Sequence, residues 1–200
     1  MTITPKNMQK TELLITFYLL QSKENVNRTI REIAAETGVS VGSVHGVLNK
    51  LTEQGYIVES GDRRLLRKRA NLIERWAHGY ADGLKNKLLI NRFAFLTPQV
   101  REQWQNIVLP AGCHWGGEPA AALLDAYIQP GKWEVYVPNN ANALITTGRM
   151  IPAPQGEIFV YKQFWPGDEM PLLVVYADLL ATEEDRCRET AERLKSQVYT

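Results

Sequence analysis

The sequence predicts an α+β fold, in which an N-terminal winged helix-turn-helix is followed by a mixed α/β C-terminal domain. The first observation is a pair of short helical patterns, joined by a glycine turn and followed by a basic hairpin pattern, within residues 29–69. The second is that helix and strand patterns alternate through residues 93–200 without an internal repeat. The third is a change in charge balance between these two regions.

The charge of the chain is unevenly distributed, although the 200 residues carry a net charge of only +1. Residues 1–92 hold 15 Lys and Arg against 9 Asp and Glu, whereas residues 93–200 hold 8 against 13. A basic first half and an acidic second half predict that only the first half binds nucleic acid. We therefore expect two domains, residues 1–92 and residues 93–200.

The first predicted elements are helices. Residues 8–21 are apolar on nearly all sides, which is typical of a buried helix, and residues 22–28 form a polar loop. The run from Thr29 to Glu32 is a capping box, which begins a second helix. Gly38 ends that helix, because glycine readily adopts the left-handed conformation needed there.

The third predicted helix has two different faces. Ser40 is a good N-cap, and Val41, Val44, Leu48 and Leu51 recur every three or four residues as an inward stripe. The opposite face is small and polar, so that the backbone can approach a DNA groove closely. Its residues are Gly42, Ser43, His45, Gly46, Asn49 and Lys50.

A basic hairpin is predicted next. Residues 56–59 form a strand, Ser60 to Asp62 a turn, and residues 63–69 a return strand with five basic side chains in seven. Such a wing would contact phosphates, which supply most of the sequence-independent affinity for DNA. A helical hairpin packed for structure alone, or a winged helix used in protein contacts, is the alternative interpretation. The residues expected to bind DNA are Thr29, Ser40, Gly42, Ser43, His45, Gly46, Asn49, Lys50, Arg63, Arg64, Arg67 and Lys68.

One long helix is predicted from Asn71 to about Ile90. Its large apolar residues, from Leu72 to Leu88, repeat every four positions and must be buried against something. The helix can close the winged-helix core, dock the second domain, or pair with a second subunit. The sequence leaves these three alternatives open.

The second half predicts a mixed sheet flanked by helices. Thr97 and Pro98 begin a helix to about residue 107, and a Gly-Gly-Glu-Pro run precedes another that ends near residue 128. A short helix is expected at residues 139–147, and a final helix is expected to be capped by residues 182–185. Strands are expected at residues 133–137, 157–165 and 172–176.

Catalysis, metal binding and cofactor binding are not predicted. Glu118, Asp125 and Asp178 could together hold Mg²⁺, but no metal-ligand spacing, phosphate loop or nucleophile elbow accompanies them. The distant Cys113 and Cys187 suggest reduced thiols in a cytoplasmic protein. No signal-peptide layout or membrane-spanning stretch is visible, so we expect no membrane association.

The second half contains two motifs that carry a family resemblance. The run from His114 to Leu124 and the run from Pro171 to Thr182, in this order and with a strand between them, resemble the AbiEi family of antitoxins. The later Arg186 to Ala191 segment is similar to that family's C-terminal end. Glu183 stands where the family's pattern has glycine. The motif residues carried over are Trp115, Gly116, Gly117, Glu118, Pro119 and Asp178.

The resemblance implies a function. Members of this family are antitoxins of type IV toxin–antitoxin systems, with a winged-helix domain that binds operator repeats in double-stranded DNA upstream of their own operon. It also implies that a nucleotidyltransferase-like toxin is neutralised without forming a stable complex. The oligomeric state is left open between a homodimer and cooperative monomers. A DNA-targeted metal-dependent nuclease or nucleotidyltransferase, and a replication accessory protein of a mobile element, are the alternative functions.

Overall fold

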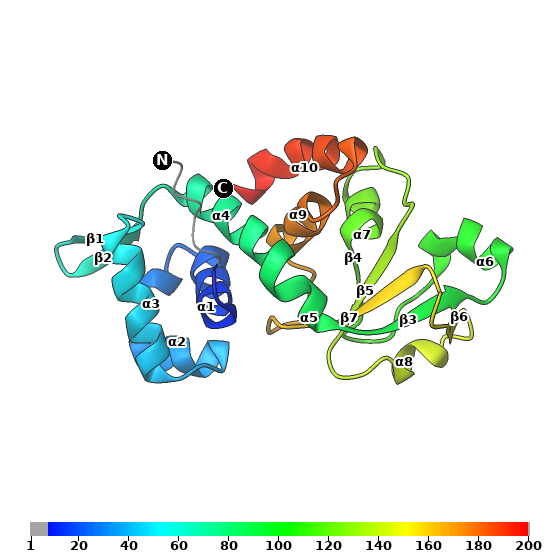
Figure 1. The fold of residues 1–200 in the computed structure, drawn as a ribbon, viewed down its shortest axis with the longest axis horizontal. Helices are drawn as coiled ribbons and strands as arrows, with labels where there is room; N and C mark the ends of the chain where they lie inside the picture. The colour runs from blue at the N-terminus through cyan, green and yellow to red at the C-terminus, as the bar shows by residue number, and fades with distance from the viewer. Residues whose placement is uncertain (1–7, 200) are drawn as a thin grey trace. The chain divides into compact units, whose positions relative to one another are not determined.

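The computed structural model describes residues 8–199 and divides into two compact units. The first unit ends at Leu84 and the second begins at Lys85, so each unit is described by itself (Figure 1). This division lies before the expected boundary between residues 92 and 93, which would cut a strand of the second unit. The assignment of independent domains remains a prediction.

The first unit has the element order of a winged helix. Three helices, α1 (Lys10–Gln21), α2 (Ile30–Thr37) and α3 (Val41–Glu53), are followed by the antiparallel hairpin of β1 (Ile57–Ser60) and β2 (Arg63–Leu66). A short 3₁₀ turn, η1 (Asn25–Asn27), joins α1 to α2. The return strand is shorter than expected, because the chain enters the next helix at Arg69.

The predicted helix boundaries of this unit follow from its caps. The Thr29 hydroxyl accepts from the Glu32 amide while the Glu32 carboxylate accepts from the Thr29 amide, so the capping box is confirmed. Gly38 has φ of +66° and ends α2 as expected. The Ser40 hydroxyl accepts from the Ser43 amide at the start of α3. One expectation is wrong: Val41 is 49 % exposed and lies outside the inward stripe.

Helix α4 (Arg69–Tyr80) closes the core of the first unit. A π-helical segment (Ala81–Lys85) and the short α5 (Asn86–Leu88), which belongs to the second unit, continue the chain. The Trp76 Nε1 donates to the Leu13 carbonyl of α1 at 2.8 Å, and the Trp76 ring contacts Phe17 with centroids 5.3 Å apart. The apolar face of α4 is therefore covered at least in part by α1, within the same unit.

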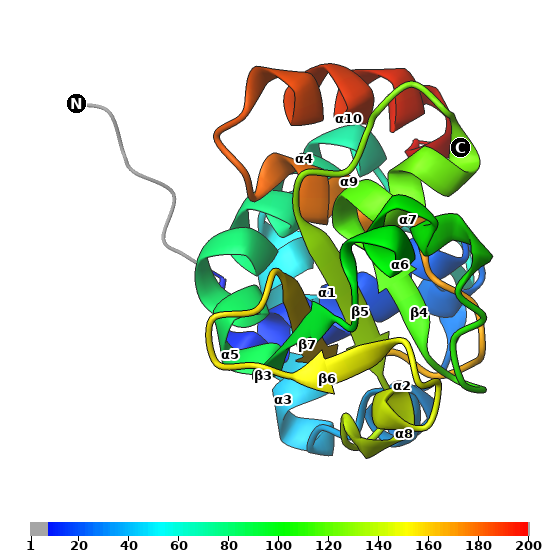
Figure 2. The ribbon, with the colours of Figure 1, turned by 90° about the vertical axis from the view of Figure 1, so that its right-hand side faces the viewer.

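The second unit is built on a mixed five-stranded sheet, so the α+β fold class is confirmed. Its strands lie in the order β4-β5-β7-β3-β6 (Figure 2). Neighbouring strands are antiparallel except β5 and β7, which are parallel. The strands are β3 (Leu89–Phe95), β4 (His114–Gly116), β5 (Trp133–Val137), β6 (Met150–Pro152) and β7 (Ile158–Lys162).

Helices cover this sheet and connect its strands. α7 (Gly117–Leu124) packs on β4 and β5, α9 (Leu172–Leu180) packs on α7 and β4, and α10 (Asp185–Val198) packs on α9 (Figure 2). The shorter α6 (Pro98–Glu102), η3 (Trp104–Asn106) and α8 (Asn142–Ile145) lie in the connections. Thr97 caps α6 as expected, but the helix is shorter than predicted and gives way to η3.

Three expectations about the second unit are wrong. Residues 172–176 form the first part of helix α9 rather than a strand, because nearly every side of this apolar run is buried and periodicity does not distinguish the two. The chain from Leu89 to Phe95 is a strand that the sequence analysis missed. Finally, α10 begins at Asp185, and the Thr182 hydroxyl donates to the Leu179 carbonyl at the end of α9.

Candidate functional site

The outward face of α3 is the first part of the candidate nucleic-acid interface. Gly42, His45, Gly46 and Asn49 are exposed on it, while Val44, Leu48 and Leu51 are buried on the other side. The Asn49 Nδ2 and His45 Nδ1 atoms are 3.4 Å apart, so the two side chains lie together along the helix. An amide and an imidazole so placed can donate to or accept from base edges in a major groove.

A second part of the polar face is turned toward α1. Ser43, Gly46 and Lys50 line a groove of about 450 Å³ together with Gln9 and other residues at the start of α1. The Ser43 hydroxyl also contacts the Ser40 hydroxyl at 2.9 Å. The side chains of Ser43 and Lys50 are therefore less accessible than those of His45 and Asn49, which are exposed.

Lys50 is paired with an acid that the sequence analysis did not consider. Its Nζ lies 2.5 Å from Oε2 of Glu12 on α1, and the Glu12 Oε1 accepts from Arg75 Nη2 on α4 at 3.0 Å. The Glu12 side chain is only 5 % exposed, so removing one of its cations would leave a buried carboxylate less well compensated. Glu12 thus ties α1, α3 and α4 together, and part of the Lys50 charge is used within the protein.

The wing presents one basic face to solvent. Arg63 and Arg67 are exposed. Side chains alternate between the two faces of an extended chain, so these arginines share one face with Leu65, which lies between them and is 42 % exposed. Arg64 points the other way, and its guanidinium donates to the Arg28 carbonyl at 2.7 Å. The Arg64 backbone also exchanges two hydrogen bonds with the Asn27 side chain, which fixes the wing against η1.

Three further residues expected at the interface, Thr29, Ser40 and Lys68, are exposed and also have roles at the starts of helices. Thr29 and Ser40 are exposed, but each hydroxyl already accepts a backbone hydrogen bond as a helix cap. Lys68 is exposed and has a left-handed backbone with φ of +50° where the chain passes from the wing into α4. A second hydrogen bond to phosphate would be compatible with a cap, because a hydroxyl can also donate.

The motif of the second unit is internal. Trp115, Gly116, Gly117, Glu118, Pro119 and Asp178 are all buried, at the point where β4 ends and α7 begins. A Cβ at Gly116 would collide with the Tyr136 ring, and one at Gly117 would collide with the Glu134 carboxylate. The Gly117 amide donates to Asp178 Oδ2 at 3.2 Å, so the two halves of the motif meet directly.

A buried ionic cluster occupies the space beside these glycines. The Lys85 Nζ lies 2.8 Å from Oε2 of Glu134 and 2.8 Å from Oδ1 of Asp178. The Tyr136 hydroxyl donates to Asp178 Oδ1 at 2.8 Å, and Lys132 Nζ reaches the other oxygen of Glu134 at 2.5 Å. Asp178 therefore lies within helix α9 and bonds to this cluster.

The charges of the cluster set the pKa values of its members. Burial alone lowers the pKa of Lys85, but Asp178 and Glu134 raise it by more, so Lys85 remains a cation. Burial raises the pKa of Glu134, but Lys85 and Lys132 lower it by more than burial raises it, which keeps this carboxylate ionised. The pKa of Asp178 is raised, because burial and the neighbouring Glu134 outweigh the attraction of Lys85.

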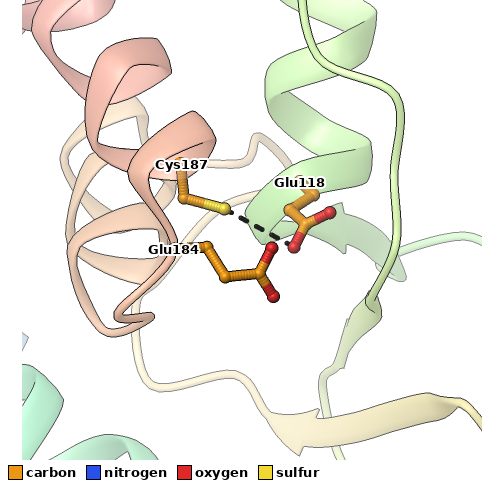
Figure 3. Close-up of side chains that lie close together, drawn as sticks. All are labelled: Glu118, Glu184 and Cys187. Carbon is orange, nitrogen blue, oxygen red and sulfur yellow. Dashed lines mark hydrogen bonds between the residues drawn. The ribbon is translucent and has the colours of Figure 1, made fainter.

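Glu118 belongs to a separate group of polar side chains. Its carboxylate accepts from the Gly131 amide at 2.6 Å and pairs with the Arg186 guanidinium at 2.9 Å. Figure 3 shows Glu118 facing Glu184 and Cys187, and the Cys187 thiol donates to the Glu118 carboxylate at 3.6 Å. Burial raises the pKa of Cys187, which disfavours the thiolate that a metal ion would need.

The carboxylates considered for Mg²⁺ are each paired with a different cation. Glu118 pairs with Arg186, Asp125 with Arg193, and Asp178 with Lys85. Glu118, Glu184 and Cys187 do lie close enough to offer three ligand atoms within 4.8 Å of one another. Arg186 contacts both of these glutamates, so its charge already fills the role that a metal ion would have. This arrangement favours a structural role for Glu118.

The arrangement of the first unit defines a winged-helix DNA-binding protein. The MarR family profile matches residues 7–65, and the profile described as "Transcriptional regulator, AbiEi antitoxin, Type IV TA system" matches residues 64–200. The chain therefore belongs to the AbiEi antitoxin family, and it is a DNA-binding transcriptional regulator of the type IV toxin–antitoxin kind. No curated protein and no solved structure matches the chain. Within residues 8–199, no helix is both long and apolar enough to cross a membrane.

The buried cluster generates a prediction about stability. Replacing Lys85 by Met keeps much of the side-chain volume but leaves Glu134 and Asp178 without their shared cation. We expect Lys85→Met to lower the free energy of unfolding by about 3–5 kcal/mol, the range for breaking a buried ion pair. Chemical denaturation followed by tryptophan fluorescence measures this change.

Lys162→Met is the matched control, because Lys162 is exposed at the end of β7 in the same unit. We expect it to change the free energy of unfolding by less than about 0.5 kcal/mol. Equal effects of the two substitutions would contradict a stabilising role for the cluster.

Proposed function

We propose that this protein represses its own operon by binding operator repeats in double-stranded DNA through α3 and the wing. The observation that carries the proposal is the exposed His45–Asn49 pair on an α3 face flanked by Gly42 and Gly46. Those glycines allow close approach of the helix to a groove, and the basic wing can contact the adjacent phosphates. The DNA contacts are assigned to the following residues: Thr29, Ser40, Gly42, Ser43, His45, Gly46, Asn49, Lys50, Arg63, Arg64, Arg67 and Lys68.

The individual residues have different roles in this proposal. His45 and Asn49 contact base edges, because they point outward from α3. Arg63 and Arg67 contact phosphates from the exposed face of the wing. Lys50 and Arg64 contribute charge near the interface while they remain bonded to Glu12 and to the Arg28 carbonyl. DNA binding thus depends most on the outward residues.

The C-terminal domain, in this proposal, carries the antitoxin activity. It counters a nucleotidyltransferase-like toxin without forming a stable complex and without catalysing a reaction itself. The pairing of Glu118 with Arg186 and of Asp178 with Lys85 supports a non-enzymatic role for both carboxylates. We place the protein in the cytoplasm, where its DNA is. It binds the repeats either as a homodimer or as cooperative monomers.

Footprinting on the DNA upstream of the protein's own gene tests the proposal. We expect protection of repeated sequences by the wild-type protein. Asn49→Ala should weaken binding to these repeats by roughly 1–3 kcal/mol, the range for one good base contact, and should affect random DNA much less. Equal loss on both kinds of DNA would show that Asn49 contacts only the backbone.

The control for Asn49 is Asn140→Ala, which alters an exposed asparagine of the second unit. It should leave the footprint and the affinity unchanged. Absence of any protected repeat upstream of the gene would contradict autorepression, and full affinity of Asn49→Ala would show that α3 docks through another face.

The wing is expected to contribute affinity rather than sequence preference. Arg63→Ala and Arg67→Ala should each reduce the slope of log K against log salt concentration by about one unit, because each removes one phosphate contact. Arg64→Ala should change the slope less, since its guanidinium already donates to the Arg28 carbonyl. Fluorescence anisotropy over a series of salt concentrations measures the slopes.

Arg188→Ala, which removes a 58 % exposed arginine side chain from α10, serves as the charge-matched control and should not change the slope. If Arg63→Ala and Arg67→Ala also leave it unchanged, these arginines are solvated surface and the wing does not follow the phosphates.

A fragment experiment tests the division of labour between the domains. The fragment consists of residues 1–84, because a chain ending at residue 92 would carry part of β3 without the strands that pair with it. The fragment retains α1, α3, the wing and α4, so it should unfold cooperatively and bind the operator. It should fail to rescue cells from the toxin, because the antitoxin activity is assigned to the remainder.

The full chain at equal expression provides the comparison for rescue. A fragment that lacks a cooperative thermal transition would contradict an independent N-terminal domain. Rescue by the fragment alone would assign the antitoxin activity to repression of the operon and would leave the second domain with another task.

A further inference from the structure

The second unit contains an apolar hollow that the proposed functions do not use. It has a volume of about 360 Å³ and lies between the segment before β4, the helix α7 and the start of α9. This volume falls within the range of about 300–1,000 Å³ that is typical of small-molecule sites. Its walls include Ile107, Cys113, His114, Trp115, Leu124 and Val175, so apolar and aromatic surface predominates.

The edge of the hollow is also apolar. Leu123 and Leu124, at the end of α7, are 55 % and 57 % exposed. Val108, which lies between two residues that line the hollow, is 87 % exposed. A ligand that covered these side chains would gain about 25 cal/mol of binding free energy for each Å² of apolar surface removed from water.

One polar atom in the wall of the hollow is the buried Nε2 of His114, which has no hydrogen-bond partner among the described residues. Burial lowers the pKa of His114 by more than the nearby Asp168 raises it, so the imidazole is neutral at neutral pH. A neutral imidazole can accept one hydrogen bond and donate another, which suits a ligand with a single polar group.

The lining of the hollow restricts the ligand further. None of the described residues that line it is Asp, Glu, Lys or Arg, so a charged ligand would lose its hydration there without gaining an ion pair. The shape argues against a protein partner, since a stable protein interface buries about 800 Å² on each side. The exposed apolar side chains at the edge are too few to supply such an area.

We propose that this hollow binds a small, uncharged, largely aromatic molecule that forms one hydrogen bond with the His114 imidazole. The ligand packs against Trp115 and Val175 and covers Leu123 and Leu124 at the edge. Nothing in this site depends on DNA binding by the first unit, so the two functions can be tested separately.

The test uses N-phenyl-1-naphthylamine, an uncharged fluorescent molecule whose two aromatic groups are joined by one N–H. Titration of the full-length protein should show saturable binding of one molecule per chain, with increased probe emission. The 8-sulfonate derivative has the same aromatic groups and a negative charge. We expect it to bind about ten-fold more weakly, because the uncharged lining offers its sulfonate no cation to replace lost hydration.

Two substitutions at the hollow and one elsewhere locate the binding site. Leu124→Gln should weaken binding of N-phenyl-1-naphthylamine by about ten-fold, because it removes apolar contact from an exposed position. His114→Phe should weaken it by about five-fold, because the ring remains but the hydrogen bond is lost. Leu96→Gln is the matched control, since Leu96 is 50 % exposed in the same unit and does not line the hollow, and it should bind like wild type.

Three results would overturn the proposal. The first is the absence of saturable binding, and the second is equal binding by wild type and Leu124→Gln. The third is a wild-type dimer in analytical ultracentrifugation that Leu124→Gln dissociates, because the hollow would then be an interface between two copies of the chain.

Discussion

The second unit depends on one buried cation. Lys85 is held between Glu134 on β5 and Asp178 on α9, so a single ammonium group joins the first residue of the unit to its sheet and to its covering helix. Carboxylates this deeply buried are costly unless they are paired and hydrogen-bonded. The neighbouring residues meet that requirement: Tyr136 donates to Asp178, and Lys132 pairs with Glu134.

This constraint explains the residues of the family motif. Gly116 has no side chain because the Tyr136 ring lies where a Cβ would be, and Gly117 leaves space for the Glu134 carboxylate. Gly117 also has φ of +50°, a backbone conformation that favours glycine. The two glycines of the motif therefore mark the interior of the AbiEi domain.

Sequence reasoning was most successful where a local rule fixes the structure. The capping box at Thr29, the left-handed Gly38 and the Ser40 cap each involve residues that are near in sequence, and all three are confirmed. The same reasoning failed for residues 172–176, because a helix buried on nearly every side and a buried strand give the same apolar run. The missed β3 carries a weaker signal, the alternation of buried Phe93 and Phe95.

The candidate site was predictable only in part for the same reason. The polar face of α3 follows from helical spacing, but the partners of Lys50 and Arg64 lie far away in sequence, on α1 and before α2. No spacing rule connects Glu12 to Lys50, or Lys85 to Asp178. Such pairs become visible only after the fold has brought distant residues together.

The ion pairs of Glu12 with Lys50 and Arg75 affect how this regulator can change over evolutionary time. Lys50 of α3 and Arg75 of α4 both pair with Glu12 of α1. Among the described residues, the side-chain hydrogen bond of His45 and Asn49 stays within α3. Substitutions at the outward positions can therefore accumulate with little cost in folding. Under the proposed assignment of His45 and Asn49 to base contacts, this protein could acquire a new operator by substitutions at these exposed sites, while the orientation of α3 stays unchanged.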